Sequence, residues 1–346
     1  MKTKEKSEVS STGKPARAAP RSGTRKRSAP ATRPPGEPDA RVAQWVEAHL
    51  EALPPRSKSL VVTVIGDSIA PHGGEIWMGS LIELLQPFNF NDRLVRTSVF
   101  RLTEEGMLES RREGRRALYT LTASGKKRFE RAHRRIYMPP SQSWNGTWTL
   151  VMTPRAGNNE VDRVELRREL AWLGFATIGQ GILAHPSTDV AALREVLESL
   201  ELLDKVYVMQ AHDLNYFGAL PAREIVSQCW TLDGLAELYK DFWQRFKPML
   251  DYFRLEPNPN PLQAFQVRTL VIHAYRRAIL NDPQFPAEIL PANWPGHEAY
   301  ALCRDLYNLC CRPAEQHLAS VLGIRTDRPP PAEPYYYLRF GGLVDG

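Results

Sequence analysis

The sequence is poor in cysteine and has no long apolar run. It contains four cysteines, and the spacing of Cys229, Cys303, Cys310 and Cys311 fits neither a disulfide framework nor a zinc site. A reducing compartment is therefore indicated, and we expect a cytoplasmic location. No stretch of 18 or more apolar residues occurs, and no apolar segment follows the basic N-terminus. These absences argue against a membrane-spanning helix and against a secretory signal.

The positive charge is concentrated in two parts of the chain. The 346 residues carry a formal charge of +6, and this length suggests two or three domains. Residues 1–36 carry +8 and are rich in Ser, Pro, Ala and Gly, so we expect residues 1–37 to form a disordered basic tail. Residues 91–135 carry +7, and the remainder is −9. This asymmetry indicates a polyanionic partner, and nucleic acid fits better than a membrane surface because no large apolar face accompanies the charge.

Residues 38–137 show the order of elements of a winged helix-turn-helix domain. Apolar periodicity and helix caps predict three early helices, then a hairpin with Gly114 in its turn, then a last helix. The predicted helices cover residues 39–53, 57–69, 91–105 and 122–135, with a further short helix at 79–85. The predicted strands cover 107–112 and 117–121. This arrangement is typical of a DNA-binding module.

The helix at residues 91–105 separates apolar from basic side chains. Val95, Val99 and Leu102 recur at helical spacing and are expected to face the core. Basic and polar candidates for DNA contacts lie largely elsewhere on this helix, namely Arg93, Arg96, Thr97 and Arg101, and around the hairpin turn, namely Arg111, Arg112, Arg115 and Arg116. Arginine can pair with guanine in a groove or with phosphate. The alternative for any one of these residues is an ordinary solvated basic face.

Residues 143–217 predict a ferredoxin-like α+β domain. The pattern gives a strand at 147–152, a helix at 158–173, a strand or hairpin at 175–184, a helix at 189–203 and a strand at 205–209. Domains of this kind commonly pair with themselves, so a role in dimerisation is expected by analogy.

Residues 223–322 predict a mainly helical domain with many aromatic side chains. Helical patterns cover 232–252, 262–280 and 297–309, and an extended tail is expected over 323–346. An aromatic core is the simpler interpretation. The alternative is a pocket for an aromatic ligand that carries phosphate groups, and its candidate residues are His273, Tyr275, Arg276, Arg277 and Trp294.

The chain resembles the phenylacetic-acid-degradation repressor family, the PaaX-like regulators. The resemblance rests above all on the segment Val95-Arg96-Thr97-Ser98-Val99-Phe100-Arg101-Leu102, with Pro71-His72-Gly73-Gly74 before it and Gly114-Arg115-Arg116 after it. The segment 270–296, with Tyr275-Arg276-Arg277 and Trp294-Pro295-Gly296, also matches. In order, the matching stretches extend from about residue 57 to residue 309.

The resemblance implies a homodimeric repressor of phenylacetate catabolism genes that phenylacetyl-coenzyme A releases from double-stranded operator DNA. It places Arg96, Thr97, Ser98 and Arg101 on the recognition helix and Arg115 and Arg116 in the wing. It also implies a winged-helix domain, a central ferredoxin-like domain and a helical domain that binds the effector. We expect neither a cofactor nor a metal, no membrane partner and no enzymatic activity.

Two other functions remain open from the sequence. The central domain resembles small CRISPR-associated nucleases, whose fold carries an acidic metal ligand at the end of the first strand. Here Met152-Thr153-Pro154 offers no such ligand, and Asp162, Glu165 and Glu169 look like surface charges on one helix. The third possibility is an architectural DNA-binding protein that responds to no ligand.

Overall fold

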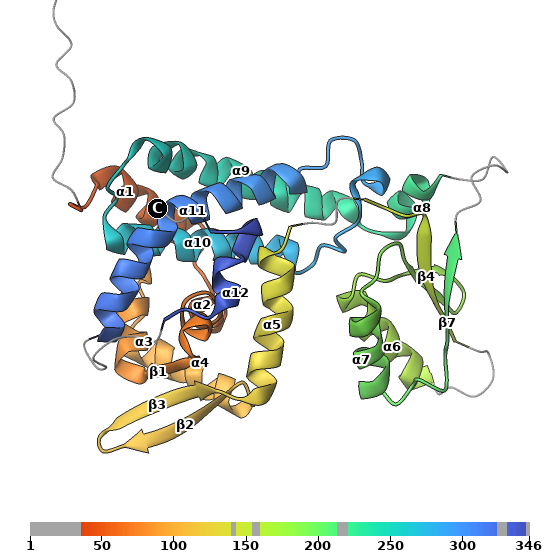
Figure 1. Ribbon diagram of the computed structural model, residues 1–346, viewed down its shortest axis with the longest axis horizontal. Helices are drawn as coiled ribbons and strands as arrows, with labels where there is room; N and C mark the ends of the chain where they lie inside the picture. Colours follow the sequence, from red (N-terminus) through yellow and green to blue (C-terminus); the bar gives the residue numbers. More distant parts are fainter. Residues whose placement is uncertain (1–35, 140–142, 154–159, 213–220, 324–330, 344–346) are drawn as a thin grey trace, which may run out of the picture. The chain divides into compact units, whose positions relative to one another are not determined.

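The fold combines many helices with two small antiparallel sheets, which confirms the predicted α+β class (Figure 1). The computed structural model describes residues 36–139, 143–153, 160–212, 221–323 and 331–343. From residue 35 onward the chain forms a single compact unit. The basic tail predicted for the first 37 residues lies almost entirely outside the described part.

The first helices follow the predicted order closely. They are α1 (Ala40–Ala52), α2 (Ser57–Val64), α3 (Met78–Leu85) and α4 (Asp92–Glu104), and η3 (Gln86–Phe88) joins the last two. Side chains cap three helices of this region as the sequence suggests: Asp39 accepts from the Arg41 amide, Asn91 from the Leu94 amide and Thr122 from the Gly125 amide. After Val64 the helical path of α2 continues as a π-helical turn, η1 (Ile65–Ile69), and then as a 3-10 turn, η2 (Ala70–His72).

The predicted hairpin is part of a three-stranded sheet with the order β1-β3-β2. Its strands are β1 (Glu75–Trp77), β2 (Leu108–Glu113) and β3 (Arg116–Leu121), and α5 (Ala123–Tyr137) follows. Strand β1 was not predicted, because three residues are too few to show a periodicity. Gly125 permits α5 to pass close to the start of β2, since a Cβ atom there would lie 2.2 Å from the Met107 carbonyl oxygen.

The central segment forms the second sheet, with the order β5-β6-β4-β7. Its elements are β4 (Thr147–Met152), α6 (Glu160–Trp172), β5 (Ala176–Gly179), β6 (Ile182–His185), α7 (Val190–Ser199) and β7 (Tyr207–His212). Helices α6 and α7 lie on one face of this sheet (Figure 1). There, Leu166 and Leu170 of α6 and Leu193 and Leu197 of α7 join Val151 of β4 in a separate small core.

The regular elements described in the C-terminal segment are all helices. It contains α8 (Ala222–Cys229), α9 (Leu232–Leu255), α10 (Pro261–Ile279), η5 (Ala287–Ile289) and α11 (Gly296–Gly323). The sequence pattern did not predict helix α8. Helix α11 also extends well beyond the predicted residue 309, with Pro313 inside it. Helix α10 packs against α9 and α11 and also against α1, α2 and α5.

The prediction of an extended tail over residues 323–346 is wrong for its described part. Residues 334–337 form α12 (Pro334–Tyr337), and η6 (Arg339–Gly341) follows. Tyr336, Arg339 and Phe340 are buried there. The proline-rich composition suggested an extended tail. The segment folds instead, because Tyr336 and Phe340 are removed from water by burial.

One hydrophobic core connects the first helices with the C-terminal helices. Residues of α1 to α4 belong to the same buried cluster as residues of α9, α10 and α11. In the described ranges, no helix is long and apolar enough to cross a membrane.

Candidate nucleic-acid interface

Helix α4 buries one face and exposes a basic one. Val95, Val99 and Leu102 are at most 1% exposed, as their spacing predicted. The opposite face exposes the four predicted DNA-contacting residues of this helix, Arg93, Arg96, Thr97 and Arg101. At 100° per residue these four positions fall within less than half of the helix circumference, so all of them can approach one partner.

The exposed side chains of α4 are only weakly held. Arg96 lies 3.7 Å from the Asp92 carboxylate in a solvated i,i+4 pair. Pairs of this kind contribute only about 0.3–0.5 kcal/mol, so the Arg96 guanidinium is available to a ligand at little cost. The Thr97 hydroxyl donates to the Arg93 carbonyl oxygen over 2.8 Å.

Ser98 does not belong to this surface. It is 2% exposed, and its hydroxyl donates to the Leu94 carbonyl oxygen over 2.8 Å. The family resemblance placed Ser98 on the recognition helix, and it does lie on α4, but on the buried side. We therefore correct the prediction that Ser98 contacts DNA.

Phe100 is a candidate that the sequence reasoning did not select. Its side chain is 62% exposed although it is large and apolar. It lies on α4 one turn after Arg96 and therefore on the same exposed face. An exposed aromatic group among arginines can touch a thymine methyl group or a base edge. The helical spacing from Arg96 was the signal that could have identified it.

The hairpin carries the second group of basic residues. Gly114 occupies the turn with φ +60°, a conformation that suits glycine. Arg111 pairs with Glu113 at 2.6 Å. The other three predicted residues, Arg112, Arg115 and Arg116, are exposed, and none has a side-chain hydrogen bond or ion pair among the described residues. Helix α4 packs against β2, the first strand of this hairpin.

The five residues predicted to bind an aromatic ligand do not form one site. The His273 Nδ1 atom lies 2.8 Å from the Thr63 hydroxyl oxygen, and Arg276 donates to the same oxygen over 2.8 Å. Burial lowers the pKa of His273 to about 3, and it lowers the pKa of Arg276 as well. Both side chains therefore join α10 to α2 instead of facing a ligand.

The remaining three residues are placed elsewhere. Tyr275 is 1% exposed and Trp294 is 8% exposed, and both line a cavity of only about 20 Å³. Such a space is far too small for an aromatic ligand, which needs roughly 300 Å³ or more. Arg277 is exposed on another side of α10. His273, Tyr275, Arg276 and Arg277 are neighbours in the sequence, but successive positions of a helix point in different directions.

The carboxylates considered for nuclease chemistry show no metal-binding arrangement. Glu165 and Glu169 pair with Arg168 at 3.0 and 3.1 Å. The side chain of Asp162 lies outside the described residues. In the part of the chain that the structure describes, no group of three or more His, Cys, Asp or Glu side chains is placed to hold a metal ion.

Together these elements define a protein in which a basic helix and a basic hairpin are held on a shared helical core beside a small α+β sandwich. Three family models match this chain in order: "PaaX-like protein" over residues 56–125, "PaaX protein central Cas2-like domain" over 141–226 and "PaaX-like protein C-terminal domain" over 230–320. The chain belongs to the PaaX-like family.

A curated relative agrees with this assignment. The chain is similar to "Transcriptional repressor PaaX" of Escherichia coli strain K12, with 33% identity over 300 residues, which are 86% of this chain and 94% of the relative. Among solved structures, it is similar to "Uncharacterized protein Rv0674 from Mycobacterium tuberculosis", with 22% identity, a TM-score of 0.45 and coverage of 69% of this chain and 89% of that one.

Proposed function

We propose that this protein is a DNA-binding transcriptional repressor of phenylacetic acid catabolism genes, and that an aromatic acyl-coenzyme A such as phenylacetyl-coenzyme A releases it from its operator. The exposed face of α4, with Arg93, Arg96, Thr97 and Arg101, is the observation that carries the proposal. Membership of the PaaX-like family and the name of the Escherichia coli relative support it.

In this proposal residues 38–137 act as a winged helix-turn-helix domain. Helix α4 enters the major groove, and Phe100 and the arginines of its exposed face contact bases and phosphates. Arg112, Arg115 and Arg116 of the hairpin contact the adjacent backbone or minor groove. The order of elements, in which α2, β1, α3 and α4 are followed by β2, β3 and α5, supports this assignment.

The direct test is a titration of the full-length protein into a labelled duplex from upstream of its neighbouring genes. Binding should favour this duplex over a scrambled one of equal length, and phenylacetyl-coenzyme A should weaken it. Equal affinity for both duplexes, with no response to the thioester, would support the architectural alternative. Magnesium-dependent cleavage of the duplex would support the nuclease alternative.

Removing a hairpin arginine should change the salt dependence of DNA binding. The logarithm of the binding constant falls with the logarithm of salt concentration, with a slope of about −0.9 per neutralised phosphate. Arg115→Ala should therefore make the slope shallower by about 0.9 and weaken all sequences alike. The control is Arg194→Ala, which removes an exposed arginine of α7 and should leave the slope unchanged. An unchanged slope in Arg115→Ala would remove this residue from the interface.

We also propose that the four-stranded sheet pairs two copies of the chain, so that two α4 helices meet successive half-sites of an operator. Strand β7 supports this proposal. It lies at one edge of the sheet, and Tyr207, Val208 and Met209 are 62%, 45% and 45% exposed. Consecutive strand residues face opposite sides, so both sides of β7 are open. It has no lysine or proline of the kind that keeps sheet edges apart.

A charge on β7 should weaken self-association. We expect Met209→Lys to raise the dimer dissociation constant at least about tenfold, because like charges would meet in a symmetric interface. Sedimentation velocity over a range of protein concentrations measures this. Val190→Lys is the matched control, because Val190 is 56% exposed on α7 and away from the strand edge. A dimer unaffected by Met209→Lys would exclude β7 as the interface.

A further inference from the structure

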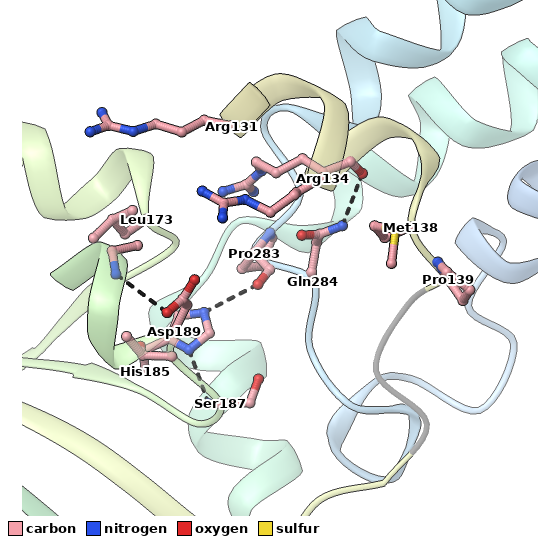
Figure 2. A pocket seen from close by; sticks show the side chains of 13 residues that line it. Arg131, Arg134, Met138, Pro139, Leu173, His185, Ser187, Asp189, Pro283 and Gln284 are labelled. Atoms are coloured by element: carbon pink, nitrogen blue, oxygen red, sulfur yellow. Dashed lines mark hydrogen bonds between the residues drawn. The ribbon is translucent and has the colours of Figure 1, made fainter. Parts of the chain in front are cut away.

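A cavity beside the C-terminal end of α5 is not used by the proposed DNA interface. Its volume is about 290 Å³, close to the lower end of small-molecule sites. Four separate parts of the chain line it: the end of α5, Leu173 after α6, the segment from β6 to α7, and the loop after α10 (Figure 2). In Figure 2, Arg131 and Arg134 extend from α5 on one side, and His185, Ser187 and Asp189 lie on the other.

The α5 wall of this cavity carries three arginines, and their positive charge is incompletely matched. Arg131 pairs with Glu195 of α7 at 2.5 Å. Arg134 has no hydrogen bond or ion pair from its side chain among the described residues. Arg135 contacts no carboxylate there, and its guanidinium donates to the backbone carbonyl oxygens of Trp172 and Asp282. An anion in the cavity would therefore meet cationic groups that are not already neutralised.

Two polar atoms in the lining are buried without a partner. The Nε atom of Arg135 and the hydroxyl of Thr188 each lack a hydrogen-bond partner within the described part of the chain. A buried polar group that makes no hydrogen bond costs about 1–3 kcal/mol, so a native structure normally satisfies it. Both residues line this cavity, so its lining contains polar groups whose hydrogen bonding within the described part of the chain is incomplete.

The other side chains of the lining fit a ligand that is anionic at one part and apolar at another. Leu173, Met138 and Pro283 add apolar side chains to the lining, and Met138 is 45% exposed. Burial lowers the pKa of His185 to about 4, so this imidazole is neutral near pH 7 and adds no charge. Asp189 is the acid of the lining, but one of its oxygens already accepts from the Ala191 and Ala192 amides at the start of α7.

We propose that this cavity is the effector site and holds the phosphate-bearing part of an acyl-coenzyme A, with Arg134 and Arg135 as its phosphate ligands. The inference rests on the proposed function, which supplies a ligand with phosphate groups beside an apolar chain. A cavity of this size holds one part of such a molecule, and the arginines select the phosphates.

The position of the cavity also gives the ligand a route to the DNA interface. Helix α5 follows strand β3 directly, so it carries the basic hairpin at its N-terminal end and the cavity at its C-terminal end. A ligand that contacts α5 and the β6–α7 segment at the same time stabilises the arrangement of these two elements in which both contacts form, relative to other arrangements. Differential binding of this kind is what couples an effector to DNA release.

The test is calorimetric titration of the full-length protein with phenylacetyl-coenzyme A, free coenzyme A and phenylacetate. Arg134→Gln should weaken both coenzyme A compounds at least about tenfold, since a charge-assisted hydrogen bond is lost. Ala192→Leu, which fills the cavity without changing charge, should weaken them as well. Arg194→Gln is the matched control, because its side chain is 73% exposed on α7 and outside the lining. Thermal unfolding of each variant verifies that it is folded.

The outcomes separate this inference from the proposed function. If the wild-type protein binds phenylacetyl-coenzyme A and leaves the operator, but Arg134→Gln and Ala192→Leu do so at the same concentration, the cavity is not the site and the proposed function stands. If phenylacetate alone binds as tightly as the thioester, the phosphate assignment is wrong. If the wild-type protein binds neither coenzyme A compound, both the cavity and the proposed effector are overturned.

Discussion

Replacing Asp67 by asparagine is expected to lower the free energy of unfolding by about 3–5 kcal/mol, because it removes a carboxylate that neutralises buried arginines. Among the described residues, Arg339 loses its only carboxylate partner, whereas Arg268 keeps its pair with Glu315. Asp67 lies in the π-helical turn after α2 and is 2% exposed. Its carboxylate contacts Arg268 of α10 at 3.3 Å and Arg339 of η6 at 3.1 Å, and both arginines are fully buried. Chemical denaturation followed by circular dichroism measures the change.

Two tyrosines complete the hydrogen bonding of Asp67. Tyr137 of α5 donates to it over 2.7 Å, and Tyr307 of α11 donates over 3.0 Å. Burial raises the pKa of both tyrosines well above the usual range, so their hydroxyls stay protonated and remain donors. Five elements from distant parts of the sequence therefore meet at one carboxylate, and a substitution there affects all of them.

Asp305→Asn is the matched control for this prediction. Asp305 also pairs with two arginines, Arg254 at 2.9 Å and Arg304 at 2.8 Å, but its side chain is 30% exposed. Exposed pairs contribute about 0–1 kcal/mol, so this variant should stay close to the wild type. If the two asparagine variants lose the same stability, burial of the Asp67 cluster is not what makes it important.

Arg96→Ala is expected to weaken operator binding by about 1–3 kcal/mol, which is roughly 5- to 150-fold in the dissociation constant. The loss follows because a guanidinium on the exposed face of α4 can form two hydrogen bonds with one guanine. Fluorescence anisotropy with the operator and with a scrambled duplex, at one fixed salt concentration, measures the effect and its sequence dependence.

Arg96→Lys separates base reading from simple charge. Lysine keeps the positive charge but lacks the planar pair of donors, so it should restore binding to the scrambled duplex more fully than binding to the operator. The exposed pair with Asp92 is too weak to make either substitution destabilising. Equal losses on both duplexes for Arg96→Ala would assign Arg96 to a phosphate and leave base reading to its neighbours on α4.

The helices and their caps could be predicted from the sequence because both depend on neighbouring residues. Asn91 and Thr122 cap α4 and α5 through amides three positions away, and Val95, Val99 and Leu102 repeat with the period of a helix. The same local periodicity places Arg96 on the exposed side. It also places Ser98 on the buried side, which shows that the error over Ser98 came from the family resemblance and not from the spacing.

The predicted ligand residues do not gather at one cavity, because the partners of their side chains are distant in sequence. Arg276 contacts Thr63, which lies 213 positions earlier, and His273 contacts the same side chain. Residues in a row on a helix looked like a cluster, but packing of α10 against α2 on one side and α11 on the other separates them.

The sequence alone predicts most of the helices and strands in their order, with β1, α8 and α12 as exceptions. It also predicts the uneven distribution of charge and the basic residues on the exposed face of α4. Each of these depends on composition or on residues within about one helical turn. Only the tertiary structure decided that Asp67 and Arg339 meet across 272 positions, that the first helices share a core with α10, and that Arg134 lines a cavity with Ala192. Such contacts form when packing brings distant segments together, and no local periodicity records which segments meet.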